Sequence, residues 1–212
     1  MNKRHIALAG AVTLVLAACA SMHGSNNASN EEIHAKAVAM MKASFKEQGQ
    51  AKLDRLDQDE AQRICSAIHD GKTLSKDDAA RIEKGQQANI KYPADGKYLG
   101  DWKAGERIAQ TGVGLQWTDT ANQVNGGNCY ACHQLSKAEI SFGNIGPSLY
   151  NYGKLRGNGE AVVRYTWGKI WNTNAYNACS SMPRFGDAGI LTEAQIKDLM
   201  ALLLDPSSPV NQ

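Results

Sequence analysis

The stretch Cys129-Tyr130-Ala131-Cys132-His133 decides how this sequence is interpreted, because it places a histidine directly after two cysteines that are three residues apart. Two thiols at this spacing could be half of a zinc site or a redox-active dithiol. No second cysteine pair exists to complete four zinc ligands. A thioredoxin-type dithiol would lie within a β-α-β pattern, which the surrounding sequence lacks.

The complete C-x-x-C-H pattern is typical of covalent attachment of one haem c. Cys129 and Cys132 can each form a thioether with one vinyl group of the haem, and His133 then follows at once to ligate the iron from the proximal face. Attachment of this kind takes place outside the cytoplasm, so the motif also predicts an exported protein.

The second axial ligand is expected to be a methionine, because His/Met ligation is characteristic of cytochromes c. After residue 95 the only methionines are Met182 and Met200. Met200 follows the helical apolar pattern of Ile196 and Leu199, which predicts a core position. Met182 precedes Pro183 in a loop-like stretch and is the expected ligand. The alternatives are a five-coordinate iron and ligation by Cys179.

The stretch Ile145-Gly146-Pro147-Ser148-Leu149 is similar to a segment of class I cytochromes c that turns past the proximal histidine. The resemblance implies that the Pro147 carbonyl accepts the ring N–H of His133 and fixes the ring orientation. Residues 101–109 resemble the N-terminal helix of the same fold, in which a glycine lets the C-terminal helix cross closely. The expected fold is therefore all-α, with a class I cytochrome c domain at 96–212.

Four segments in this order resemble the SoxX family, the small monohaem cytochromes of the SoxAX complex of bacterial sulfur oxidation: 126–133, 143–149, 165–172 and 182–186. The resemblance implies a periplasmic heterodimer with SoxA, whose haem catalyses oxidative joining of thiosulfate to a cysteine of the SoxYZ carrier. SoxX would pass the released electrons to an acceptor cytochrome c, as the electron-transfer subunit of an L-cysteine S-thiosulfotransferase. No catalytic residue is then expected in this chain. A free-standing electron carrier and a small haem enzyme or sensor with an open distal site are the alternatives.

The N-terminus has the layout of a secretory signal peptide at 1–18, with Lys3 and Arg4 before a short apolar run. The run ends in Leu16-Ala17-Ala18-Cys19, which resembles a bacterial lipoprotein box. Cys19 would then carry a lipid that anchors the periplasmic protein to a membrane. Cleavage after Ala18-Cys19-Ala20 by an ordinary signal peptidase is the alternative. Residues 19–29, rich in Ser and Asn, are expected to form a flexible tether.

Residues 30–95 are expected to form a helical extension without chemistry of its own. Three helix starts are predicted there, from Ser29-x-x-Glu32, Asp57-x-x-Glu60 and Ser75-x-x-Asp78. The extension contains Cys65, which with Cys179 remains after haem and export account for the other cysteines. Two spare thiols in an oxidising compartment predict a disulfide, and a buried free Cys65 is the alternative.

The composition excludes several classes of protein. The formal net charge of the 212-residue chain is +2, too small to indicate binding to nucleic acid. No apolar run reaches the length of about 20 residues that a membrane-spanning helix needs. Residues 1–18 hold Lys3, Arg4 and no acidic residue, so the mature chain would carry 21 basic and 21 acidic side chains. Any docking to partners would then depend on local patches of charge.

Overall fold

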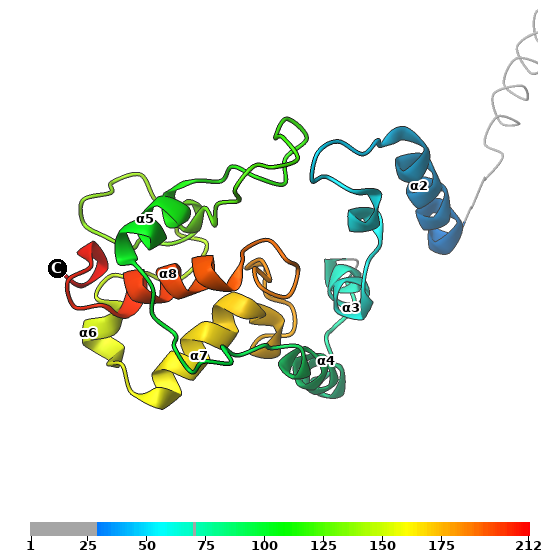
Figure 1. The fold of residues 1–212 in the computed structure, drawn as a ribbon. Coiled ribbons are helices and arrows are strands. Elements are labelled where there is room, and N and C mark those ends of the chain that lie inside the picture. Colours follow the sequence, from blue (N-terminus) through cyan, green and yellow to red (C-terminus); the bar gives the residue numbers. More distant parts are fainter. Residues whose placement is uncertain (1–28, 70) are drawn as a thin grey trace, which may run out of the picture. The chain divides into compact units, whose positions relative to one another are not determined.

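The computed structural model describes residues 29–69 and 71–212 and divides the chain into two compact units, one ending at Phe45 and one comprising Lys46–Gln212 (Figure 1). The sequence predicted an all-α fold. Among the described residues the regular elements are helices, and the β-type pairing is an isolated bridge between Gln48 and Ala51. The all-α expectation is confirmed. The expected signal peptide, Cys19 and the tether before Ser29 lie outside the described residues.

The first unit contains α2 (Asn30–Ser44), which begins with the expected capping box. The Glu32 N–H donates to Ser29 Oγ at 3.2 Å, and the Ser29 N–H donates to a Glu32 carboxylate oxygen at 2.9 Å. These two bonds satisfy backbone donors that the first turn of a helix would otherwise leave free. No residue of α2 is buried, so the helix depends on its local caps rather than on a core.

The second unit begins with the short 3-10 helix η1 (Leu53–Leu56), followed by α3 (Glu60–His69) and α4 (Lys76–Ala88). Ser75 caps α4 as expected, accepting the N–H of Asp78 at 3.0 Å. The expected start of α3 at Asp57 was wrong by two residues. Asp59 and Gln62 form the reciprocal cap instead, with both bonds at 2.8 Å.

Helices α3 and α4 share a small apolar cluster with a loop more than 90 residues later in the chain: Ala61 and Ile82 are buried against Ala178. This packing places both helices in the same compact unit as the C-terminal half. The division of the chain into the two units falls at residue 46.

The core of the second unit lies where α5 (Trp102–Gln110) crosses α8 (Glu193–Leu204), with α7 (Glu160–Trp171) packed beside α8 (Figure 1). Gly105 makes the crossing close, because a Cβ there would collide with the backbone of Asp198. Met200 is fully buried, which confirms its expected core position. Trp167 is also fully buried and stacks on Trp171, with ring centroids 5.9 Å apart.

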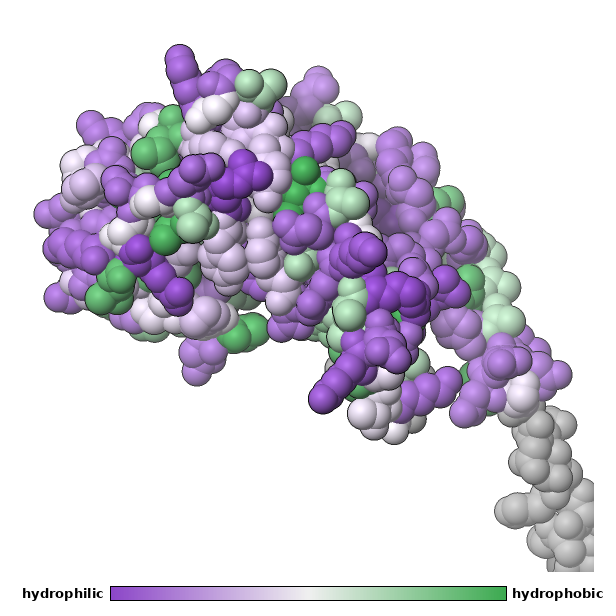
Figure 2. Space-filling model, turned by 90° about the horizontal axis from the view of Figure 1, so that it is seen from below, coloured by the Kyte–Doolittle hydropathy of each residue, from purple (hydrophilic) through white to green (hydrophobic). Residues whose placement is uncertain are grey.

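The second unit also contains three shorter helices in its C-terminal half: α6 (Tyr152–Arg156), which was not expected from the sequence, η3 (Thr173–Ala175) and η4 (Pro209–Asn211). Within the described ranges, no helix is both long and apolar enough to span a bilayer. The face in Figure 2 is mainly hydrophilic, with apolar side chains in small separate groups.

Candidate haem site

A cavity of about 850 Å³ lies in the second unit, and three segments that are distant in sequence line it. The first contains Cys129, Cys132 and His133, the second is residues 145–150, and the third contains Met182. The structure thus brings the residues expected to attach haem and both expected axial ligands to one cavity.

The first segment is held by the end of α5. The Gly127 N–H donates to Ile108 O at 2.8 Å, and the Asn128 N–H donates to Thr111 O at 2.9 Å. Asn128 then adopts the left-handed conformation, with φ at 47°. Asparagine is among the few residues with a side chain that tolerate this region.

The chain next makes one tight turn, η2 (Cys129–Ala131). The Cys132 and His133 N–H groups both donate to Cys129 O, at 3.1 and 2.9 Å. The C-x-x-C-H spacing corresponds to this turn, which brings both thiols and the imidazole to the same cavity wall.

The second segment runs beside the first and orients the imidazole. Two backbone bonds join the segments, from the Gly143 N–H to Tyr130 O and from the Gly146 N–H to Cys132 O, both 2.8 Å long. His133 Nδ1 lies 2.7 Å from Pro147 O. Since a carbonyl can only accept, Nδ1 carries the proton and Nε2 is left as the nitrogen that can bind iron.

Gly146 keeps the two segments close together. A Cβ at this position would collide with the imidazole ring of His133. Sequence reasoning identified Pro147 but not this role of Gly146, because the contact depends on how the two segments pack.

The environment of Cys129 favours a neutral sulfur. Burial raises the pKa of this thiol to about 12, so the free side chain stays protonated at neutral pH. A thioether to haem is uncharged, and burial does not oppose it.

The third segment brings Met182 to the cavity from the loop between α7 and α8. Met182 is half-buried, and its N–H donates to Ser180 Oγ at 3.3 Å. Phe185 lies further along the same cavity wall and is buried. Cys179 also lines the cavity, but it is joined to Cys65 of α3 by a disulfide. In this state it has no thiol to offer as an iron ligand.

The remaining lining suits a flat apolar ring that carries anionic groups. Apolar walls come from α6, α7, α8 and the loop before α6, through Leu149, Tyr152, Ile170 and Leu203. The lysine and arginine side chains of the lining are Lys169 and Arg156, and no carboxylate is among the lining residues. Burial lowers the pKa of Lys169. A haem propionate would compensate this desolvated cation, so the donor set and the charge both fit haem.

A second group of polar residues behind Tyr130 was not expected from the sequence. The Tyr130 hydroxyl donates to Glu106 Oε1 at 2.9 Å and lies 3.0 Å from Ser136 Oγ. Gln110 Nε2 donates to the same carboxylate oxygen at 2.9 Å. The other oxygen, Glu106 Oε2, is buried without a hydrogen-bond partner. Burial is the main reason that the pKa of Glu106 is raised, and the pKa of Tyr130 rises to about 12.

Comparison with known proteins agrees with this site. The sequence model of the family "Cytochrome c" matches residues 118–205, which cover the motif, the Gly-Pro turn and the Met182 loop. The chain therefore contains a cytochrome c domain, and its helices correspond to the class I fold. A cytochrome c domain implies covalently bound haem c.

A relative from Aquifex aeolicus (strain VF5) is described as an uncharacterized lipoprotein. It is 41% identical over 138 residues, which are 64% of each chain. The match thus covers less than two thirds of the relative's length. The relative is similar in sequence, but its description gives no activity.

Proposed function

We propose that this protein is a periplasmic monohaem c-type cytochrome that transfers electrons as a SoxX-like subunit. The observation that carries the proposal is that all four segments resembling SoxX contribute to the lining of the same cavity. Independent structural segments would not be expected to converge in this way unless they serve one group.

In this proposal the residues divide the work. Cys129 and Cys132 hold the haem by thioethers, and His133 and Met182 ligate its iron. When bound, the haem supplies a one-electron couple, and methionine ligation raises its potential. The Pro147 carbonyl keeps the imidazole in the required tautomer. Arg156 and Lys169 compensate the propionates.

Electrons would enter or leave where the cavity opens to solvent. Exposed apolar side chains stand at its rim, with Ile145 79%, Leu155 77% and Tyr165 43% exposed. Their exposure supports docking of another protein at the haem edge, because an apolar rim is otherwise unfavourable in water. The partners would be SoxA, the SoxYZ carrier through the complex, and an acceptor cytochrome c.

Anchoring is the second part of the proposal. The sequence Leu16-Ala17-Ala18-Cys19 and the description of the Aquifex relative both support a lipid on Cys19. Mass spectrometry of the mature N-terminus would test this. A mature chain that begins at Ser21 without added mass would contradict it.

The ligand assignment is tested by the ferric absorption spectrum. A His/Met haem is expected to show an Fe–S charge-transfer band at the red end of the visible spectrum, and Met182→Ala is expected to abolish it. The control is Met200→Leu, which changes the core methionine and is expected to keep the band. A wild-type protein without the band would favour the open-site enzyme or sensor.

The SoxX assignment needs a separate test. A SoxA-like chain is expected to co-purify with the holoprotein, and thiosulfate is expected to reduce the haem only when that chain and the carrier are present. A stable monomer with no effect on thiosulfate turnover would instead identify a free-standing carrier.

A further inference from the structure

The loop that carries Met182 is contacted from outside by α3 and α4, helices for which the proposed function has no role. Its backbone between α7 and α8 is mostly irregular, with η3 at its start. Backbone hydrogen bonds close turns before and after Met182, among residues 172–180 and among residues 184–191. The position of Met182 therefore depends on how other elements hold these turns.

Two contacts fix the part of the loop before the methionine. The disulfide joins Cys179, three residues before Met182, to Cys65 of α3. The preceding Ala178 is buried, and its N–H donates to Glu83 Oε1 of α4 at 3.2 Å. One covalent bond and one hydrogen bond therefore attach this side of the loop to both helices.

The part after the methionine is fixed by Arg184, two residues beyond Met182. Its guanidinium lies 2.6 Å from Asp59, the cap of α3, and 3.4 Å from Gln86 Oε1 of α4. Only 20% of the Arg184 side chain is exposed, so this ion pair is less screened than one on the surface.

Gln86 also reaches the beginning of the loop. Its Oε1 accepts from Asn172 Nδ2 at 2.8 Å, and Asn172 is fully buried. A single side chain of α4 therefore contacts the loop both before and after Met182.

We propose that these four residues of the extension, Asp59, Cys65, Glu83 and Gln86, form a clamp that positions Met182 as the distal ligand. The inference rests on the proposed function, since it requires Met182 to bind iron. The attachments lie on both sides of Met182 in the sequence. They restrict the loop to conformations in which the thioether lies at the cavity wall.

The effect of the clamp can be measured by letting an added ligand compete with Met182 for the distal coordination position of the iron. An added ligand such as imidazole binds iron only when Met182 has left, so its apparent affinity scales with the fraction of molecules whose loop is open. A clamp that lowers this fraction lowers imidazole affinity. A contact that stabilises the fold only globally leaves the affinity unchanged while the protein is folded.

The experiment uses the full-length ferric holoprotein and titrates imidazole while the Fe–S charge-transfer band is recorded. Gln86→Ala and the double variant Cys65→Ser with Cys179→Ser each remove part of the clamp without introducing a free thiol. We expect each to raise the apparent imidazole affinity by about tenfold, equivalent to 1.4 kcal/mol and below the usual contribution of one disulfide.

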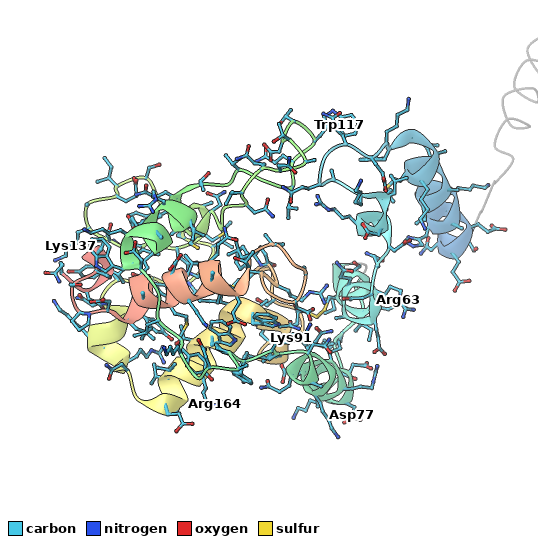
Figure 3. The ribbon with its side chains drawn as sticks, in the orientation of Figure 1. Arg63, Asp77, Lys91, Trp117, Lys137 and Arg164 are labelled. Atoms are coloured by element: carbon cyan, nitrogen blue, oxygen red, sulfur yellow. A yellow bond between two sulfur atoms is a disulfide. The ribbon has the colours of Figure 1, made fainter. Side chains whose placement is uncertain are left out.

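Two matched controls lie on the same helices outside the clamp. Arg63 on α3 and Lys84 on α4 are exposed (Figure 3 labels Arg63), and Arg63→Ala and Lys84→Ala are expected to leave the imidazole affinity unchanged. If the double variant fails to fold, Gln86→Ala alone decides, because it leaves the disulfide intact.

The outcomes separate the inference from the function on which it rests. A wild-type band that Met182→Ala abolishes, together with wild-type imidazole affinity in the clamp variants, overturns the clamp and leaves the proposed function standing. A wild type without the band overturns the ligand assignment and the clamp together. Raised affinity in the controls as well as in the clamp variants would also overturn the clamp.

Discussion

Gly146 lies so close to His133 that the glycine is part of the candidate haem site, although it bears no functional group. Gly146→Ala is expected to displace the imidazole and weaken its bond to Pro147. Forcing a methyl group into a packed site costs about 1–3 kcal/mol. Denaturant unfolding of the holoprotein, followed by haem absorbance, would measure the loss.

The matched control for this prediction is Gly85→Ala on α4. A Cβ at Gly85 meets nothing within 4 Å, and alanine is favoured over glycine in a helix by about 0.5–1 kcal/mol. Glycine-to-alanine substitution should therefore stabilise the protein at position 85 and destabilise it at position 146. Equal destabilisation at both would show that the collision with His133 has no energetic importance.

Glu106 gives a prediction about pH. Its pKa is raised from 4.5, mainly by burial, and Glu139 nearby adds repulsion. The folded state thus holds this proton more tightly than the unfolded state. The stabilising effect is complete below the unfolded pKa and is lost as pH rises through the folded one. Glu106→Gln keeps an acceptor for Tyr130 and Gln110 but cannot ionise.

The melting temperature of Glu106→Gln, relative to wild type, is therefore expected to increase from acid to neutral pH. Thermal unfolding across this range would measure it. Glu31→Gln on exposed α2 is the control and should follow the wild type at each pH. A constant difference between Glu106→Gln and wild type would mean that the carboxyl is not desolvated in the folded protein.

At the residue scale, the part of the candidate site that can be predicted from the sequence is the part whose spacing is dictated by chemistry. Two thioethers and an adjacent ligand require C-x-x-C-H, so Cys129, Cys132 and His133 can be found without a structure. Arg156, Lys169 and Glu106 have no such spacing. Packing of α6 and α7 places Arg156 and Lys169 at the cavity, and packing of α5 places Glu106 beside Tyr130. A sequence window does not contain that information.

At the scale of elements, the start of a helix could be predicted where only one nearby residue fits the N-cap pattern. Ser29 and Ser75 cap α2 and α4 as expected. At α3 two aspartates precede the helix, and Asp59 with Gln62 was chosen over Asp57 with Glu60. Both pairs fit the capping pattern, so local sequence could not decide between them.

The crossing of α5 and α8 gives the prediction at this scale. Gly105→Ala would place a methyl group against the Asp198 backbone, and backbone yields less than a side chain. We expect the free energy of unfolding to fall by about 1–3 kcal/mol, the usual cost of overpacking. Denaturant unfolding would measure it. Gly85→Ala is again the control. Unchanged stability of Gly105→Ala would indicate that the helices can separate at little cost.

At the scale of the whole molecule, the extension was expected to be an appendage, but its two ends behave differently. α2 buries no residue, whereas α3 and α4 bury Ala61 and Ile82 against the Met182 loop. The sequence did not distinguish them, because all three helices have sparse apolar patterns. What differs is the presence of a partner surface, which belongs to a loop over 90 residues away.

This difference predicts the outcome of two truncations, each exported with a cleavable signal. A chain beginning at Lys46 lacks α2 and the residues before it. Its free energy of unfolding is expected to lie within about 0.5 kcal/mol of that of the full protein, as for changes at exposed sites. A chain beginning at Asn89, with Cys179→Ser, retains the bond from Trp167 Nε1 to Lys91 O but loses α3, α4 and the disulfide. Its free energy of unfolding is expected to fall by about 2–5 kcal/mol, the usual cost of removing a native disulfide.

Denaturant unfolding, followed by haem absorbance, would compare the full protein with the two truncated chains. If the chain from Lys46 lost as much free energy of unfolding as the chain from Asn89, the expected difference between α2 and the two helices α3 and α4 would be wrong.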